Sequence, residues 1–373
     1  MKTVRRLLYR DIAGSVFFVG LAFVALFFFI DFVEELTDRR SREAGAARAA
    51  AHALLQIPGH LYELMPIAVL IGTIYALSRM AQSSEFTILR TAGLGPGRAL
   101  RLLAAAGLGF AAVTFVLGDF LAPWTEREAV LLKARDAGGL ATGRTGAWLK
   151  ERRRDGPLEV SVAVNVAGAS PQGVLRGVQI FEFDAASGVL RRRIDAATAT
   201  VQAQSWTLAE ARVTLWPSAD ALSSSTAPRV STQAFDRLDW PSALGAQVVA
   251  AAVLPLQTMS TADLWRYSRH LGTQEQASRR HEIQFWKRAV YPLACLVMVA
   301  LALPFAYLRA RSGGLSVKVF GGIMLGISFV LANNLTGHLG VLRGWEPWVA
   351  AATPGLVYLM IAMAAFSWLV RYR

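Results

Sequence analysis

Residues 138–145 read GGLATGRT and are one substitution short of the phosphate-binding loop G-x-x-x-x-G-K-[ST]. In that loop a lysine reaches the terminal phosphates of a nucleotide, and a strand leads into the loop. Arg144 stands here in the place of the lysine, and no strand-like run precedes Gly138. Arginine is a rigid planar fork where the loop needs a compact ammonium group. We therefore expect no nucleotide site in this stretch.

No other spacing in the chain is typical of an enzyme or a metal centre. There is no H-E-x-x-H pair and no G-x-S-x-G turn, and no ligand spacing links the histidines at positions 52, 60, 270, 281 and 338. Asp31, Glu63 and Asp119 lie near the ends of apolar runs, where we expect them to be solvated and not to relay protons. The patterns therefore predict no catalytic residue, no metal ligand and no cofactor bound by this chain.

A short helix is predicted at residues 84–93, between two long apolar runs. Ser84 is a favourable N-cap, and Glu85 suits the positive end of the helix dipole. Gly93 can adopt the left-handed conformation that ends a helix, and Pro96 prevents any continuation. The helix would be roughly 12 Å long at 1.5 Å per residue. Because so short a helix is marginal alone in water, we expect it to dock on another surface.

Two interpretations of this helix stay open. It either closes a helical hairpin as a connector, or it is a coupling helix that a separate soluble motor protein grips. Spacing alone favours the connector. In the coupling interpretation Glu85 and Arg90 orient the partner by charge, and the docking face comprises Phe86 and Leu89 with Ala92 or Gly93.

The composition is that of a membrane protein. Of the 373 residues, 54% are hydrophobic, which exceeds the usual share in soluble domains. The net charge of +13 does not indicate nucleic-acid binding, because the basic residues flank apolar runs and no nucleic-acid recognition motif accompanies them. Membrane topology and acidic lipids explain basic residues in such positions.

Six apolar runs are long enough to cross a bilayer as helices. Lys2, Arg5, Arg6 and Arg10 precede the first run, so we expect a cytoplasmic N-terminus. Counting crossings then places residues 84–93 and the C-terminus in the cytoplasm. In the fifth run Gly322 and Gly326 form a GxxxG step, which typically packs helices together. The six runs are residues 12–30, 57–78, 102–118, 289–308, 319–337 and 347–370.

The stretch between the third and fourth runs has a different character. It contains β-rich segments that partly alternate with period two, separated by turn-forming residues such as 184–188. We predict antiparallel β-structure here, a sandwich or jelly roll. The fold class is therefore an α-helical membrane protein with six transmembrane helices and an inserted all-β, jelly-roll-like periplasmic domain. The expected parts are helices 1–3 with the coupling helix (1–139), the β-domain (140–240), a basic connector helix (241–288) and helices 4–6 (289–373).

The run SEFTILRTAG at residues 84–93 resembles the S-E-[LFI]-x-[VI]-[ML]-[RQ]-A-x-G signature of the lipopolysaccharide export permeases, the LptF/LptG or YjgP/YjgQ family. The order of spans and β-insertion resembles that family over essentially the whole chain. Residues 264–271 (LWRYSRHL), 285–288 (FWKR) and 291–294 (YPLA) resemble the LptG type more than the LptF type. Residues 148–150 (WLK) resemble the motif that opens the family's periplasmic domain.

The resemblance implies a function and a set of partners. In this family two similar permeases, here with an LptF-type sibling, enclose a membrane cavity above a cytosolic ATPase dimer that holds ATP and Mg. Lipopolysaccharide is extracted from the inner membrane and passed to a periplasmic jelly-roll bridge protein, with a single-span LptC-type periplasmic protein in the assembly. The family's ATPase-coupling helix corresponds here to Ser84, Glu85, Phe86, Leu89, Arg90, Ala92 and Gly93.

Lipopolysaccharide is polyanionic at its head and multiply acylated, so it calls for an apolar cavity rimmed with cations. The candidate contacts are Arg39 and Arg40 after the first run and Lys133 and Arg135 after the third. Solvated interface residues would look the same in sequence. LptG-type first spans often carry a lysine near the outer end, where this chain has Asp31, so that contact is not carried over.

Two other functions stay open on sequence. One is the permease of a different motor-coupled system that transmits force to periplasmic partners without moving lipid; copurified lipopolysaccharide would distinguish it. The other is a membrane-embedded enzyme acting on lipid, against which the missing catalytic pattern argues.

Overall fold

The structure is a computed structural model of the chain, and it consists of a helical unit and a β unit. The helical unit comprises Met1–Thr37, Ala46–Glu126 and Ser260–Arg373, and the β unit comprises Asp38–Gly45 and Arg127–Met259. The structure describes residues 2–37, 45–83, 85, 88, 91, 95–136, 140–141, 146–155, 158–169, 174–202, 205–216, 230–242, 244, 258–270, 275–307 and 314–371.

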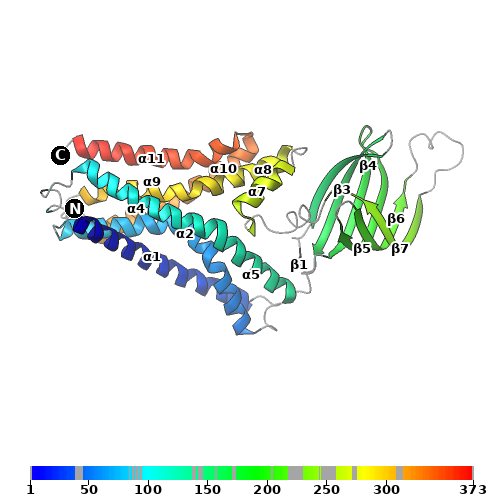
Figure 1. Ribbon diagram of the computed structural model, residues 1–373, viewed down its shortest axis with the longest axis horizontal. Helices are drawn as coiled ribbons and strands as arrows, with labels where there is room; N and C mark the ends of the chain where they lie inside the picture. The colour runs from blue at the N-terminus through cyan, green and yellow to red at the C-terminus, as the bar shows by residue number, and fades with distance from the viewer. Residues whose placement is uncertain are drawn as a thin grey trace. The chain divides into compact units, whose positions relative to one another are not determined.

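The described part of the helical unit contains six stretches long and apolar enough to cross a membrane, as predicted. Figure 1 shows that α1 begins and α11 ends at the same end of this unit, as an even number of crossings requires. The stretches are α1 (Lys2–Thr37), α2 (Ala46–Gln82), the continuous series α4 (Pro96–Val116), η1 (Leu117–Leu121) and α5 (Ala122–Asp136), the series α8 (Glu275–Val290), η4 (Tyr291–Leu293) and α9 (Ala294–Tyr307), α10 (Leu315–Arg343) and α11 (Pro347–Arg371). The short helix α7 (Thr261–His270) precedes α8.

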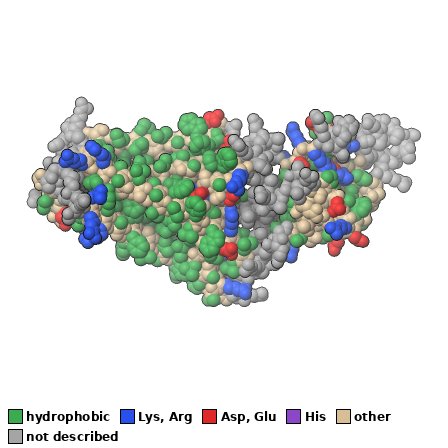
Figure 2. All heavy atoms as spheres, viewed as in Figure 1, with side chains coloured by type: hydrophobic (Ala, Val, Ile, Leu, Met, Phe, Trp, Pro, Cys, Tyr) green, Lys and Arg blue, Asp and Glu red, His purple; other side chains and the backbone are tan. Residues whose placement is uncertain are grey.

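The helix α2 is the centre of the helical unit. It is apolar on all sides, which is typical of a buried helix, and 78% of its most apolar stretch is buried, against 11% for α1. Figure 2 shows apolar side chains covering the flank of the helical unit, with Lys and Arg gathered at the end where α1 begins. The helices α1 and α10 thus leave apolar faces free for lipid or another membrane protein.

Two helices are longer than the apolar runs alone predict. Residues 46–56, expected to be a polar, alanine-rich and helical connection, are helical and form one continuous helix with the second span, because their many alanines favour helix. The third span continues past Gly118 through a π-helical turn, η1, into α5. Such turns are frequent at functional sites.

The β unit contains one antiparallel sheet of seven described strands, which confirms the predicted all-β insertion. Strands β3 to β7 pair in sequence order, and β1 and β2 both pair with β3. Within the described residues the strands form one sheet, and not the two packed sheets of a sandwich; Figure 1 shows that this sheet is curved. The strands are β1 (Leu140–Ala141), β2 (Ala147–Asp155), β3 (Leu158–Ala169), β4 (Leu175–Asp184), β5 (Leu190–Val201), β6 (Ser205–Leu215) and β7 (Ser231–Pro241).

Alternation along the strands produces the core of the β unit. In β3 the side chains of Val160, Val162, Val164 and Val166 are all at most 3% exposed, because every second residue points to the same face. Trp206 and Trp240 meet edge to face in this core, with ring centroids 5.7 Å apart.

Candidate functional site

The helix α2 ends at Gln82, just before the predicted coupling helix. The structure describes Glu85, Ile88 and Thr91 of that segment, and all three are helical and exposed. The Thr91 hydroxyl donates to the Ile88 carbonyl over 2.9 Å. Ile88 is 63% exposed, and sequence reasoning did not single it out. The remaining predicted coupling residues lie outside the described residues, namely Ser84, Phe86, Leu89, Arg90, Ala92 and Gly93.

Polar contacts join the neighbouring helices beside this segment. Arg79, near the end of α2, donates to Asp11 of α1 over 2.8 Å. The Tyr9 hydroxyl of α1 donates to the Leu102 carbonyl of α4 over 3.1 Å. The Asp11 side chain is 12% exposed, so its pairing with Arg79 is less screened than a fully solvated pair. These contacts join α1, α2 and α4 at the end of α2 that leads to the predicted coupling segment.

Where η1 meets α5, a backbone carbonyl of the third span is left without a helical donor. In η1 the Ala122 N–H bonds to the Leu117 carbonyl, five residues back. The next residue in this pattern, Pro123, has no N–H and cannot bond to the Gly118 carbonyl. The buried guanidinium of Arg288 donates to that carbonyl instead, through Nε over 3.2 Å and Nη2 over 2.5 Å. A cation from α8 thereby satisfies a carbonyl that the helix leaves open.

Residues 59–63 of α2 contact several elements around this carbonyl. The Arg288 guanidinium lies 5.8 Å from the centroid of the Tyr62 ring, a cation–π distance. Tyr62 also packs against Tyr291, with ring centroids 5.0 Å apart, and the Tyr291 hydroxyl donates to the Glu63 carbonyl. Gly118 lies so close to Tyr62 that a side chain at Gly118 would overlap the ring. We call Tyr62, Gly118, Arg288 and Tyr291 the outer cluster.

Two acidic residues of α1 pair with histidines of α2, which corrects one expectation. Asp31 accepts a hydrogen bond from, or shares a proton with, His60 over 2.8 Å, and its side chain is only 11% exposed. Glu35 lies 3.4 Å from His52 and is equally buried. The place of Asp31 near a span end predicted a solvated side chain, and this prediction is wrong. Sequence reasoning missed both pairs because the partners lie 29 and 17 residues apart, and no local spacing signals them.

Asp119, the third of the carboxylates expected to be solvated, accepts a hydrogen bond from the Thr261 N–H of α7 over 2.7 Å. It is partly buried and serves as an acceptor for the start of α7. Glu63 is exposed, as expected. Among the described residues, no group of three His, Cys, Asp or Glu side chains could hold a metal ion.

The predicted lipopolysaccharide contacts lie around the start of the β unit. Lys133 is an exposed residue of α5. Arg135 belongs to the same helix, and the structure does not describe its side chain. Arg39 and Arg40 lie outside the described residues. The structure thus places one of the four candidate side chains on an accessible helix face.

The GxxxG step packs α10 on α2. Gly322 faces Ile74, and Gly326 faces Ile67, so the two helices run in opposite directions. An equally close approach, at Gly72 of α2, was not predicted: a Cβ built there would lie 2.6 Å from both the Cα and the N of Val16 in α1. Backbone meets backbone at this point, as small residues allow in membrane helix pairs.

The variant Gly72→Ala should therefore force α1 away from α2. We expect a loss of stability of about 1–3 kcal/mol from overpacking, measured as a lower thermal midpoint of the full-length protein in detergent. Gly14→Ala is the matched control, because Gly14 lies in α1 and a Cβ there meets nothing within 4 Å. An equal loss in both variants would show that helix propensity or expression, and not the close approach, sets the effect.

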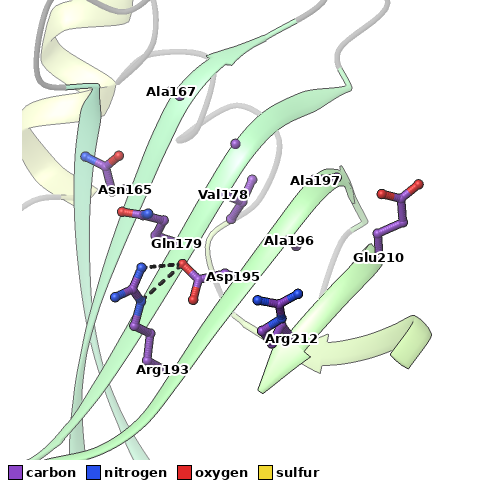
Figure 3. Close-up of a pocket in the computed structure, with 11 residues that line it drawn as sticks. Asn165, Ala167, Val178, Gln179, Arg193, Asp195, Ala196, Ala197, Glu210 and Arg212 are labelled. Atoms are coloured by element: carbon purple, nitrogen blue, oxygen red, sulfur yellow. Dashed lines mark hydrogen bonds and ion pairs between the residues drawn. The ribbon is translucent and has the colours of Figure 1, made fainter. Parts of the chain in front are cut away.

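The β unit carries a polar pocket of about 570 Å³ on the strands β3 to β6. Figure 3 shows Arg193 directed at Asp195, with which it forms an ion pair of 2.7 Å. Glu210, with a left-handed φ of 51°, and Arg212 complete the charged lining. The charges of these four residues balance, so the pocket does not have the positive potential that an anionic headgroup requires.

Comparison with known proteins decides the family. Residues 6–370 match the family described as lipopolysaccharide export system permease LptF/LptG. The chain belongs to this family. It is 24% identical over 366 residues, 97% of both chains, to the lipopolysaccharide export system permease protein LptG of Haemophilus influenzae. It is 23% identical over 344 residues, 91% of both chains, to the protein of the same name from Escherichia coli K12. The resemblance seen in the sequence is confirmed, and both relatives carry the LptG name.

Proposed function

We propose that the chain is the permease subunit of an ATP-driven exporter that extracts lipopolysaccharide from the inner membrane and passes it to a periplasmic bridge protein. The observation that carries the proposal is the family match over residues 6–370, supported by six apolar helices with an inserted β unit. The chain itself is non-catalytic. ATP and Mg bind to a separate cytosolic ATPase dimer.

The distribution of basic residues supports the orientation. Exposed arginines lie at the start of α1, at the end of α2 and at the start of α4, namely Arg5, Arg6, Arg10, Arg79, Arg98 and Arg101. The positive-inside rule puts these helix ends in the cytoplasm. The coupling segment and both termini are then cytoplasmic, and the β unit, which follows the third span, is periplasmic.

The contacts of α2 support a mechanism of force transmission. The ATPase dimer closes on the coupling segment, and the ion pair of Arg79 with Asp11 passes the displacement to α1. At its other end α2 holds the outer cluster through Tyr62 and holds α1 through His60. Because packed helices move as rigid bodies, a shift at the inner end rearranges the outer ends, where the lipid headgroup lies.

The exposed apolar faces of the helices support the proposal that other membrane components bind to this chain. On α1 the exposed apolar side chains include Phe17 and Phe18, both 71% exposed, and Phe29, 64% exposed. Faces of this kind need lipid or a second membrane protein. We propose that an LptF-type permease and the acyl chains of lipopolysaccharide cover them. A single-span LptC-type protein and the bridge protein complete the set at the periplasmic side.

The proposed headgroup contacts are basic residues that follow the first and third spans in the chain. Asp31 and Glu35 make the outer end of α1 acidic and are held by histidines, so α1 offers no cation there within its described residues. We propose Lys133, Arg135, Arg39 and Arg40 as the contacts for the anionic headgroup, with exposed Lys133 as the first to test.

Affinity purification from native membranes tests the function. We expect the tagged chain to bring down a cytosolic ATPase, a second permease and lipopolysaccharide, identified by mass spectrometry of proteins and lipids. Recovery of the ATPase without lipopolysaccharide would favour a motor-coupled permease that moves no lipid. Recovery of neither partner nor lipid would contradict the proposal.

A further inference from the structure

An unpaired cation is buried at the start of α10. Lys318 is 4% exposed, and within the part of the chain that the structure describes, its Nζ has no hydrogen-bond partner. Burial removes the hydration of an ammonium group, and without a compensating partner this is strongly destabilising. The position therefore calls for an anion.

A second unpartnered group faces this position from α2. Gly322 packs against Ile74, and the two helices run in opposite directions. One helical turn toward the start of α10 leads from Gly322 to Lys318, and the corresponding turn along α2 leads from Ile74 to Ser78. Ser78 is fully buried, and its hydroxyl has no hydrogen-bond partner among the described residues. By this helical spacing, two buried donors lie at the same level of the helix pair.

The start of α10 adds backbone donors. The helix begins after Gly314, which has no side chain to cap it, and no side-chain hydrogen bond is made there. The Val317 N–H bonds to the Gly314 carbonyl over 3.1 Å, whereas the first amides of a helix otherwise lack partners within it and form the positive end of its dipole. Lys318 is the fourth residue of α10. Because Cα–Cβ bonds tilt toward the helix N-terminus, its ammonium group leans toward these amides.

We propose that the start of α10 binds a phosphate group, and that an acidic phospholipid of the cytoplasmic leaflet supplies it. Among the described residues, the groups argued here, Lys318, Ser78 and the first amides of α10, are all donors. The next face of α10 exposes Val317 by 65%, Phe320 by 61% and Met324 by 46%. Acyl chains would cover this apolar stripe, which neither free phosphate nor a protein carboxylate would do. This inference concerns a site other than the one for lipopolysaccharide. It rests on the proposed function only for the orientation of the helices, which puts the start of α10 at the cytoplasmic leaflet.

A bound phosphate would join α10 to α2 close to the coupling segment. We expect phosphatidylglycerol to raise the thermal midpoint of the full-length protein in nanodiscs relative to phosphatidylcholine. In Lys318→Met this gain should vanish, and the midpoint in phosphatidylcholine alone should rise, because an unpaired buried charge has been removed. Lys318→Arg should keep the gain. Lys150→Met is the control at an exposed position of β2 and should behave as the wild type.

Native mass spectrometry gives a second readout that does not depend on the stability of one variant. Lys318→Met and, separately, Ser78→Ala should each retain less phosphatidylglycerol, by about tenfold for the lysine, as expected for one charge-assisted contact. Equal gains in wild type and Lys318→Met would overturn the proposal. So would stabilisation by inorganic phosphate alone to the same extent, or a lysine-dependent gain that requires the ATPase and not the acidic lipid. Loss of lipid retention with normal lipopolysaccharide export would leave the proposed function intact.

Discussion

Replacing Ile88 by glutamate should abolish recovery of the ATPase with the permease while the permease itself stays folded in the membrane. Ile88 is an apolar side chain with 63% of its surface exposed, on a helical segment at the end of α2. If a motor protein covers it, a charge placed there is buried without a partner. The expected loss is at least about 2 kcal/mol, as for a central interface residue.

The control for this variant is another exposed apolar residue that the proposed interface does not include. Val189 lies in the turn before β5 and is 46% exposed. Val189→Glu should leave ATPase recovery unchanged. Thr91→Val, which removes the hydroxyl that bonds the Ile88 carbonyl, should weaken recovery only slightly. If Ile88→Glu copurifies as well as the wild type, the coupling segment is not where the motor binds.

Removing the charge of Glu182 should cause the largest loss of stability in the β unit. This carboxylate is 4% exposed and accepts hydrogen bonds from Arg192 over 2.8 Å, Arg153 over 2.9 Å and the Trp240 ring N–H over 2.8 Å. Glu182→Gln leaves two arginines without their anion inside the domain. We expect a cost of about 3 kcal/mol, the lower end for breaking a buried ion pair, because Arg192 is 33% exposed.

Hydrogen exchange of the β4–β7 peptides in the full-length protein measures this cost, because exchange protection reports local opening. Asp236→Asn is the matched control. It removes one negative charge from β7 at an exposed position, and surface changes of this kind stay within about 0.5 kcal/mol. Equal protection in both variants would mean that the arginines find other partners and that the network around Glu182 is not what holds the strands.

The same network should make the β unit sensitive to acid. Burial by itself raises the pKa of Glu182. The hydrogen bonds from Arg192 and Trp240 and the charges of Arg192 and Arg153 lower the pKa by more than burial raises it, so the pKa lies below its ordinary value. The stabilisation is present above the unfolded pKa of about 4.3 and disappears as the pH falls through the folded pKa. The difference in protection between wild type and Glu182→Gln should therefore shrink below about pH 4. Hydrogen bonds from Ser187 and Ala186 also lower the pKa of Asp184, but both proteins share that effect.

The spans and the inserted sheet could be predicted because their signals are local. An apolar run of membrane length and an alternation of valines, as in Val160–Val166, need no knowledge of the rest of the chain. The alanines before the second span predict a helical connection, but no local signal shows that this connection and the span form the single helix α2. The single curved sheet, in place of two packed sheets, depends on pairings between strands that no run of residues specifies by itself.

The outer cluster could not be predicted because its parts are far apart in the chain. Arg288 and the Gly118 carbonyl lie 170 residues apart. The one local signal was Pro123, a proline inside a helical run that leaves a carbonyl unpaired. The sequence predicted close helix packing at the GxxxG step but not at Gly72. A single glycine in an apolar helix does not reveal which backbone approaches it.

The most direct test of the central claim is transfer of labelled lipopolysaccharide from proteoliposomes to the soluble bridge protein. The vesicles would hold this chain, its sibling permease and the ATPase. We expect transfer to require ATP, to stop when this chain is omitted and to fall with Ile88→Glu, while Val189→Glu leaves it unchanged. Transfer that continues without this chain, or at the same rate with Ile88→Glu, would contradict a permease driven through the segment at the end of α2.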